Sequence, residues 1–239
     1  MICAAAHIIL GQVFTQRQQQ GEAIAAFRKV LAINPQDLMA LTLLGQSYMD
    51  LTDYARAEEI YRHALDLGLE QADIYYSLGL IQEHKGMLAA ARNHFERAMQ
   101  LDLEHASACH RLGAVLENLG EEARALRQYG KTLKLDPEYA AACHSMARLL
   151  LKKGNTEQGR EWMQIFQRLK QYEETVKARK LAVQREPRNM DAAYQLGLVY
   201  FEHRRFEKAR GVLARILQLD PGYAAAREKL EQISKQFGP

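Results

Sequence analysis

Residues 78–95 read LGLIQEHKGMLAAARNHF, and the arrangement of small and large residues in this stretch recurs along the chain every 34 positions. Every copy except the fifth has a Leu-Gly pair, and every copy has a small residue twelve positions after the glycine column and a large residue four positions later. The glycine column contains Gly11, Gly45, Gly79 and Gly113, and Ala147 stands in the fifth copy. Small residues recur where two helices approach closely, and large residues recur where a hairpin fills its own core. The pattern therefore predicts one helical hairpin repeated along the chain.

The leucine, large-residue and turn columns keep the same step. Leucine precedes the glycine at Leu10, Leu44, Leu78 and Leu112. The large residues of the second helix are Phe27, Tyr61, Phe95, Tyr129 and Met163. The turn between the paired helices is marked by Gly86, Gly120 and Gly154, and in the second copy by Thr52-Asp53.

These columns resemble the tetratricopeptide repeat, a 34-residue helix–turn–helix unit with a small, Leu-Gly, aromatic, alanine, aromatic and proline pattern. The second copy matches it with Leu44-Gly45, Tyr48, Ala57, Tyr61 and Ala64. Proline closes three copies at Pro35, Pro137 and Pro221, whereas Leu69 and Leu103 depart from the pattern. The resemblance covers nearly the whole chain and implies an all-α fold, an α-solenoid coiled as a right-handed superhelix.

The repeat register predicts six copies and one insertion. We expect five repeats within residues 1–173, starting near residues 4, 38, 72, 106 and 140, and a sixth repeat at 190–223. The step from Ala147 to Gly197 is 16 residues too long, which predicts a basic helical insertion at 174–189 that extends the second helix of the fifth repeat. A break near Lys170-Gln171 followed by a separate helix is the alternative. Residues 224–239 are predicted to form a polar capping helix and a tail.

Composition excludes several classes of protein. Apolar residues make up 48% of the 239 residues and charged residues 26%, which is typical of a folded globular chain. No apolar run approaches the roughly 20 residues of a membrane span, so we expect no membrane partner. The apolar opening at 1–10 lacks a basic leader and is in register with the repeats, which predicts a first helix rather than a signal peptide. A cytoplasmic location is the default expectation; a periplasmic or secreted location is expected if a leader has been removed upstream of Met1.

The sequence contains no recognisable catalytic, cofactor or metal site. It has no glycine-rich phosphate loop, no HExxH motif and no GxSxG elbow. Cys3, Cys109 and Cys143 give neither a disulfide framework nor a CxxC zinc signature. His110 and His144 occupy equivalent positions in neighbouring repeats, yet a separation of about 10 Å is long for a shared metal ion without a third ligand. We therefore expect no enzymatic activity and no cofactor.

The resemblance places the binding surface on the first helices of the repeats. In tetratricopeptide arrays, side chains beside the Leu-Gly pair face a concave groove that holds an extended peptide or a short helix. The matching side chains are Gln12, Gln46, Tyr76, Glu83, His84, His110, Glu117, His144, Arg148 and Lys152. They predict a groove that passes from neutral amides through an acidic middle to a basic end, which suits a partner of mixed charge. The carboxylate clamp of some family members is missing, because Ile8 and Gln12 occupy its two positions.

The sequence thus predicts a non-enzymatic scaffold that binds a protein or peptide partner, with a monomer as the working expectation. One alternative is an accessory repeat domain of a larger bacterial-type enzyme or envelope-assembly protein. Another is binding of nucleic acid or an acidic partner to the basic insertion, whose cations are Lys177, Arg179, Lys180, Arg185 and Arg188. Nucleic acid is the less favoured of these partners, because no aromatic residues are interleaved with the cations.

Overall fold

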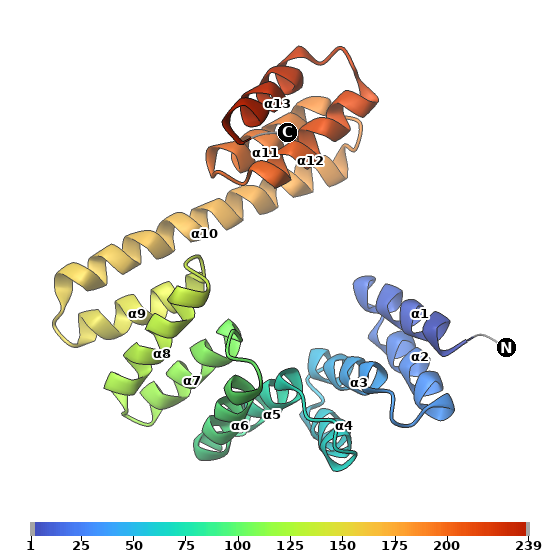
Figure 1. The fold of residues 1–239 in the computed structure, drawn as a ribbon, viewed down its shortest axis with the longest axis vertical. Helices are drawn as coiled ribbons and strands as arrows, with labels where there is room; N and C mark the ends of the chain where they lie inside the picture. Colours follow the sequence, from blue (N-terminus) through green and yellow to red (C-terminus); the bar gives the residue numbers. More distant parts are fainter. Residues whose placement is uncertain (1–2, 238–239) are drawn as a thin grey trace. The chain divides into compact units, whose positions relative to one another are not determined.

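The computed structural model describes residues 3–237, and this part of the chain contains thirteen α-helices and no β-strand (Figure 1). The helices follow one another in pairs, and only α10, with 30 residues, is much longer than the rest. Their bounds are α1 (Ala4–Gln16), α2 (Gln20–Ile33), α3 (Leu38–Asp50), α4 (Tyr54–Asp66), α5 (Ala72–His84), α6 (Leu88–Leu101), α7 (Ala106–Asn118), α8 (Glu122–Leu135), α9 (Ala140–Lys152), α10 (Thr156–Arg185), α11 (Met190–Glu202), α12 (Phe206–Leu219) and α13 (Ala224–Phe237). We call α1, α3, α5, α7, α9 and α11 the first helices. The helices that follow them, α2, α4, α6, α8, α10 and α12, are the second helices.

Side-chain caps start several of the first helices. The Asp37 carboxylate accepts a hydrogen bond from the Ala40 N–H at 2.9 Å, before α3. His105 Nδ1 accepts from the Ala108 N–H at 3.2 Å before α7, and the Asn189 side chain accepts from the Ala192 N–H at 2.9 Å before α11. An acceptor at this place satisfies one of the backbone donors that a helix start leaves unpaired. The same local device therefore sets the start of three repeats.

The glycine column marks where the paired helices touch. A Cβ atom added to Gly11, Gly45, Gly79 or Gly113 would lie within 2.6 Å of a ring atom of the aromatic residue sixteen positions later. These rings, Phe27, Tyr61, Phe95 and Tyr129, are at most 1% exposed. The prediction that glycine permits close approach while the large residue fills the hairpin is confirmed by this geometry.

The turns within the hairpins use the left-handed region of the backbone. Positive φ angles occur at Gly86, Gly120 and Gly154, as expected from their spacing. The same column is occupied by Gln18 and Thr52, with φ of 60° and 58°, and Arg204 has φ of 58° in the last hairpin. Only glycine adopts this conformation without steric cost. The repeat geometry therefore holds three non-glycine residues in a backbone conformation that their side chains disfavour.

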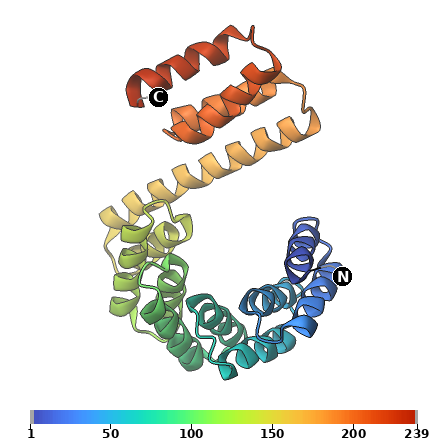
Figure 2. The ribbon, with the colours of Figure 1, turned by 45° about the vertical axis from the view of Figure 1, so that its right-hand side comes forward.

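The chain divides into two compact units, Met1–Gly159 and Arg160–Pro239, which we call the N-terminal and C-terminal units. In the N-terminal unit, the helix pairs follow one another along an arc (Figure 2). Its core contains the buried aromatic column together with leucines of the first helices, such as Leu44, Leu78 and Leu112. Each pair packs mainly on its neighbours, as expected for a repeat array.

The C-terminal unit contains most of α10 with α11, α12 and α13. Helix α10 is continuous across Lys170-Gln171. Two residues of the segment interpreted as an insertion, Val176 and Val183, pack with Leu196 and Leu213 in the core of this unit. The segment therefore has an apolar side as well as a basic one, because these valines lie seven residues apart on one face of the helix.

Helix α13 covers the end of the C-terminal unit. Its Ala226 and Ile233 are fully buried, whereas Arg227, Glu228, Glu231 and Lys235 are exposed. Lys229 is half-buried, and its Nζ lies 4.5 Å from the centre of the Phe201 ring. The helix thus has the amphipathic character expected of a capping helix.

Proline substitution at two equivalent leucines is expected to have opposite effects on stability. Leu103 is 69% exposed, its N–H donates no hydrogen bond within the described chain, and the preceding Asp102 has the same extended backbone as Asp136 before Pro137. Leu103→Pro should therefore raise the free energy of unfolding by about 0.5–1 kcal/mol, because proline restricts the unfolded chain. Urea denaturation measures the change.

Leu69→Pro is the matched control for this prediction. The Leu69 N–H donates to the Ala64 carbonyl at 3.0 Å, and the Leu69 side chain packs against the core of the N-terminal unit. Proline removes this donor, so the variant should lose about 1–2 kcal/mol. A shift of both variants in the same direction would contradict the assigned backbone hydrogen bonding.

Candidate partner-binding site

A hollow of about 370 Å³ lies across three successive repeats of the N-terminal unit. We call it the α3–α7 hollow, and it is lined by Met49, Tyr54, Leu80, Glu83, His84 and Arg111. Helix α3 contributes Met49, α4 contributes Tyr54, α5 contributes the next three residues, and α7 contributes Arg111. Two predicted groove residues, Glu83 and His84, are thus brought together with side chains from neighbouring repeats.

The charged pair in the α3–α7 hollow is loosely held. Arg111 Nη1 lies 3.7 Å from Glu83 Oε2, beyond ordinary hydrogen-bond distance. Burial raises the pKa of the half-buried Glu83 carboxyl above its usual value, and the Arg111 charge opposes this effect. Both groups retain hydrogen-bonding capacity for a partner, because neither is engaged at short range with the other.

An aromatic pair forms another wall of the α3–α7 hollow. The rings of Tyr54 and His84 have centroids 4.1 Å apart and are tilted by 39°. His84 is exposed, whereas Tyr54 is half-buried against the core. With Met49 and Leu80 also half-buried, the hollow combines apolar contact area with a few polar groups, as binding pockets generally do.

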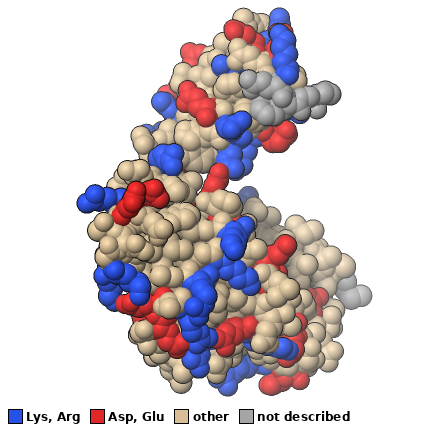
Figure 3. Space-filling model, turned by 60° about the vertical axis from the view of Figure 1, so that its left-hand side comes forward, with Lys and Arg blue, Asp and Glu red and all other residues tan. Residues whose placement is uncertain are grey.

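Five predicted groove residues are exposed, and Gln46, Arg148 and Lys152 among them are hydrogen-bonded within the chain. Gln12, Gln46, His144, Arg148 and Lys152 are exposed. The Gln46 amide donates to Asp50 at 2.8 Å, and Lys152 Nζ lies 2.6 Å from Glu122 in the preceding repeat. Figure 3 shows basic and acidic side chains interspersed over the N-terminal unit. The predicted change from an acidic middle to a basic end is therefore reduced by pairing between repeats.

Glu117 is the centre of a closed network rather than an open acidic group. Arg148 Nη1 and Nη2 lie 2.7 and 2.8 Å from its two carboxylate oxygens, and the Tyr129 hydroxyl donates to it at 2.8 Å. The Glu117 side chain is only 8% exposed. Such a bidentate pair is geometrically specific, so Arg148 and Glu117 are already engaged with each other.

His110 is buried, in contrast to its predicted place in an open groove. It is 9% exposed, its ring lies 5.1 Å from that of Tyr139 and 5.7 Å from that of Tyr129, and Nε2 lies 3.3 Å from Ser145 Oγ. The next repeat supplies Tyr139 and Ser145, and these side chains cover the imidazole. Burial, with a smaller contribution from Arg111, lowers the pKa of His110 to about 4. We therefore leave His110 out of the partner-binding surface.

Tyr76 is half-buried among aromatic rings, those of His105 at 4.9 Å and Phe95 at 5.9 Å. Burial raises the pKa of its hydroxyl. Tyr76 therefore contributes mainly packing to this face.

Over residues 3–237, no three His, Cys, Asp or Glu side chains are grouped so that they could hold a metal ion.

The predicted basic residues of α10 and of the turn after it are all exposed. They are Lys177, Arg179, Lys180, Arg185 and Arg188. None has an ion pair within the described chain. The charge also extends beyond this segment. Residues 160–239 contain sixteen lysines and arginines against ten acidic residues, a net +6, whereas residues 1–159 contain sixteen against nineteen, a net −3. The whole C-terminal unit is therefore basic.

The sequence analysis missed Tyr54 and Arg111 as members of the α3–α7 hollow. Tyr54 begins a second helix, and Arg111 lies two positions before its glycine, outside the columns expected to face the groove. The signal for Arg111 was its charge, since Ser77 and Ser145 occupy the same column in the adjacent repeats.

None of the helices in residues 3–237 combines the length and apolar character needed to cross a bilayer.

Known proteins share this arrangement. The family profile described as Tetratricopeptide repeat matches residues 2–37, 42–103 and 169–224, and a second profile of the same description matches 106–139. The chain is 24% identical over 85 residues to Protein bimA of Emericella nidulans, over 36% of this chain and 10% of bimA. The matched region is thus about a tenth of that relative.

Two solved structures illustrate the similarity. The structure of MamA is 26% identical with a TM-score of 0.59 and covers 68% of this chain and 95% of MamA. The structure of YrrB, described as a TPR protein with an unusual peptide-binding site, is 22% identical with a TM-score of 0.56 and covers 80% of this chain and 90% of YrrB. Since the profiles match well over half of the residues and the helices pair in the repeat order, this chain belongs to the tetratricopeptide repeat family.

Proposed function

We propose that this chain is a non-catalytic scaffold that binds a peptide segment of a partner protein along the first helices of its N-terminal unit. Tetratricopeptide arrays are generally interaction scaffolds that bind protein or peptide partners. The observation that carries the proposal is the α3–α7 hollow, which joins side chains of three repeats in one pocket. The peptide-binding site named for YrrB supports the same class of ligand.

The chemistry of the α3–α7 hollow suggests how a peptide is held. Met49 and Leu80 offer apolar area for one partner side chain, and the Tyr54–His84 pair offers a flat aromatic surface. Glu83 and Arg111 lie 3.7 Å apart and do not hydrogen-bond each other at short range. Glu83 can therefore accept a hydrogen bond from a backbone N–H of the peptide, and Arg111 can donate one to a backbone carbonyl of the peptide. A segment with one apolar side chain between exposed backbone groups fits this arrangement.

A double substitution tests the proposal without disturbing the repeat pattern. Leu80→Gln and Met49→Thr introduce residues that other repeats carry in the same columns, Gln12 and Gln46 for the first and Thr15 for the second. Losing the contact of one buried aliphatic side chain corresponds to about 1.5–3 kcal/mol, so partner affinity should fall at least about tenfold. The measurement is quantitative mass spectrometry of proteins co-purified from source-cell lysate, with thermal unfolding to show that the variant is folded.

Leu101→Gln is the matched control, because Leu101 is 39% exposed at the end of a second helix and lies outside the hollow. It should retain the partners of the wild-type protein. Equal recovery of the same partners by the double variant and by this control would refute binding in the hollow.

A further inference from the structure

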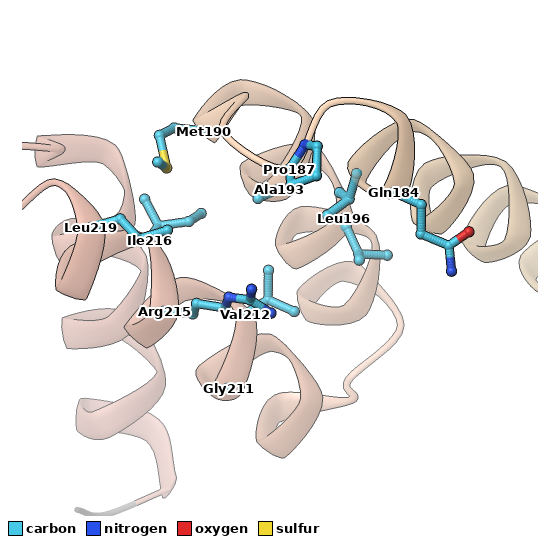
Figure 4. Close-up of a pocket in the computed structure, with 11 residues that line it drawn as sticks. Gln184, Pro187, Met190, Ala193, Leu196, Gly211, Val212, Arg215, Ile216 and Leu219 are labelled. Atoms are coloured by element: carbon cyan, nitrogen blue, oxygen red, sulfur yellow. The ribbon is translucent and has the colours of Figure 1, made fainter. Parts of the chain in front are cut away.

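The C-terminal unit has a second hollow, of about 520 Å³, between α11, α12 and the end of α10. We call it the α11–α12 hollow. Figure 4 shows Met190 and Leu196 of α11 and Val212, Ile216 and Leu219 of α12 around one space, with Arg215 beside Val212. Leu219 is 58% exposed, whereas Ile216 and Leu196 are at most 6% exposed, so the hollow has an apolar floor and an open rim. Its volume is in the range of small-ligand and side-chain pockets, roughly 300–1,000 Å³.

A glycine leaves this hollow open. Gly211 lines it and is exposed, and a Cβ atom added there would meet no other atom within 4 Å. The same repeat column contains Ala25, Glu59, Asn93 and Arg127 in the N-terminal unit and Glu161 in α10. A glycine in a helix interior costs about 0.5–1 kcal/mol relative to alanine, and packing does not require one here. The position is therefore suited to a contact with something outside the unit.

The cations around the α11–α12 hollow have no ion-pair partner within residues 3–237, whereas the acidic residues beside it, Glu186, Asp191 and Asp220, each accept a hydrogen bond from a neutral group of the same unit. Arg215 is the only ionisable residue that lines it, and it makes no ion pair in the part of the chain described. Gln184 and Pro187 also line the hollow, and each is followed directly in the chain by an exposed, unpaired cation, Arg185 and Arg188. With the net +6 of the C-terminal unit, this surface complements a negative partner.

We propose that the α11–α12 hollow docks an acidic amphipathic peptide segment of a partner protein. A large apolar side chain of the peptide inserts against Leu196 and Ile216, and neighbouring carboxylates pair with Arg215. A peptide fits better than a nucleic acid, because the hollow is lined by aliphatic side chains and contains no aromatic ring on which a base would stack. The site is separate from the α3–α7 hollow, so either proposal can fail alone.

A random 12-residue peptide display library provides an unbiased probe. Selection is performed in parallel on the wild-type 239-residue chain and on Gly211→Trp, which adds an indole at a lining position where a Cβ atom meets no other atom within 4 Å. Peptides enriched on the wild type alone should contain Asp or Glu beside Leu, Ile, Phe or Trp. In fluorescence anisotropy with such a labelled peptide, Gly211→Trp and Arg215→Glu should each weaken binding at least tenfold, and raising the salt concentration should weaken binding further.

Two substitutions serve as controls. Gly211→Ala removes the glycine but leaves the hollow open, and Arg168→Glu makes the same charge change on an exposed residue of α10 about 22 Å from Val183 along the helix. Both should bind the peptide within twofold of wild type, as should the Leu80→Gln, Met49→Thr variant.

Three results would overturn the proposal. One is a selection that enriches the same peptides on Gly211→Trp as on the wild type, or enriches none. Another is tight binding of a 20-nucleotide single-stranded DNA that Gly211→Trp does not change, with no acidic peptide enriched, which would assign the charge to nucleic acid. The third is a dimer in sedimentation that Gly211→Trp dissociates, which would assign the hollow to a second copy of this chain.

Discussion

Gly79→Leu should lower the free energy of unfolding by about 2–3 kcal/mol, because the added side chain has no space between α5 and α6. A Cβ atom at this position would lie 2.5 Å from Phe95 Cε1, and the Phe95 ring is fully buried. Overpacking of a close-packed core forces side chains from their preferred rotamers and shifts the backbone. The gain in helix propensity, about 1 kcal/mol for replacing glycine, offsets only part of this cost.

Gly21→Leu is the matched control for this prediction. Gly21 lies in α2 and is exposed, and a Cβ atom added there meets nothing within 4 Å. This variant should be as stable as the wild type or up to about 1 kcal/mol more stable. Urea or thermal denaturation of the two variants side by side measures the difference. Similar unfolding of both would show that the glycine column does not mark the closest helix contacts.

Acidification should destabilise the N-terminal unit through His110. The pKa of this imidazole is lowered to about 4 in the folded chain, whereas an unfolded histidine has a pKa of about 6.5. Between these values the unfolded state binds more protons than the folded state, so stability falls as the pH falls. The contribution is complete above about pH 6.5, and about 3 kcal/mol is lost by pH 4.

His110→Gln removes this titration while keeping an amide that can hydrogen-bond to Ser145. Urea denaturation of both proteins at intervals from pH 7 to pH 4 gives the comparison. The free energy of unfolding should fall more for the wild type than for the variant, by about 3 kcal/mol between pH 7 and pH 4, because only the wild type has the histidine titration. Parallel curves for the two proteins would show that His110 is not protected from protonation by burial.

The sequence was a good guide to the packing of the repeats, because packing follows a strict period. The Gly79–Phe95 contact and its equivalents recur every 34 residues, and each depends only on residue size. The turns were predicted where glycine occupies the left-handed position and, in the second copy, at Thr52-Asp53. Gln18 and Arg204 were not identified, because there the conformation is imposed by the adjoining helices and not by the residue itself.

The binding surface was harder to predict, because exposure in a column depends on the following repeat. His84 is open beside Tyr54, whereas His110 is covered by Tyr139 and Ser145. Arg148 pairs with both carboxylate oxygens of Glu117 in the preceding repeat. The periodicity of the sequence does not specify this contact between repeats. The α11–α12 hollow is lined by Gly211, at a position where the repeat pattern does not require a glycine. Such features arise from the fit of particular side chains and not from the repeat pattern.

The most direct test of the central claim is site-specific photo-crosslinking in source cells with p-benzoylphenylalanine at His84, in the α3–α7 hollow. The control places p-benzoylphenylalanine at His63, an exposed histidine of α4 that lies outside the hollow. The aromatic substitute at position 84 retains a ring beside Tyr54. We predict that position 84 crosslinks to a defined peptide segment of a partner protein and that position 63 does not. Crosslinks to the partner from position 63 alone would contradict binding on the first helices.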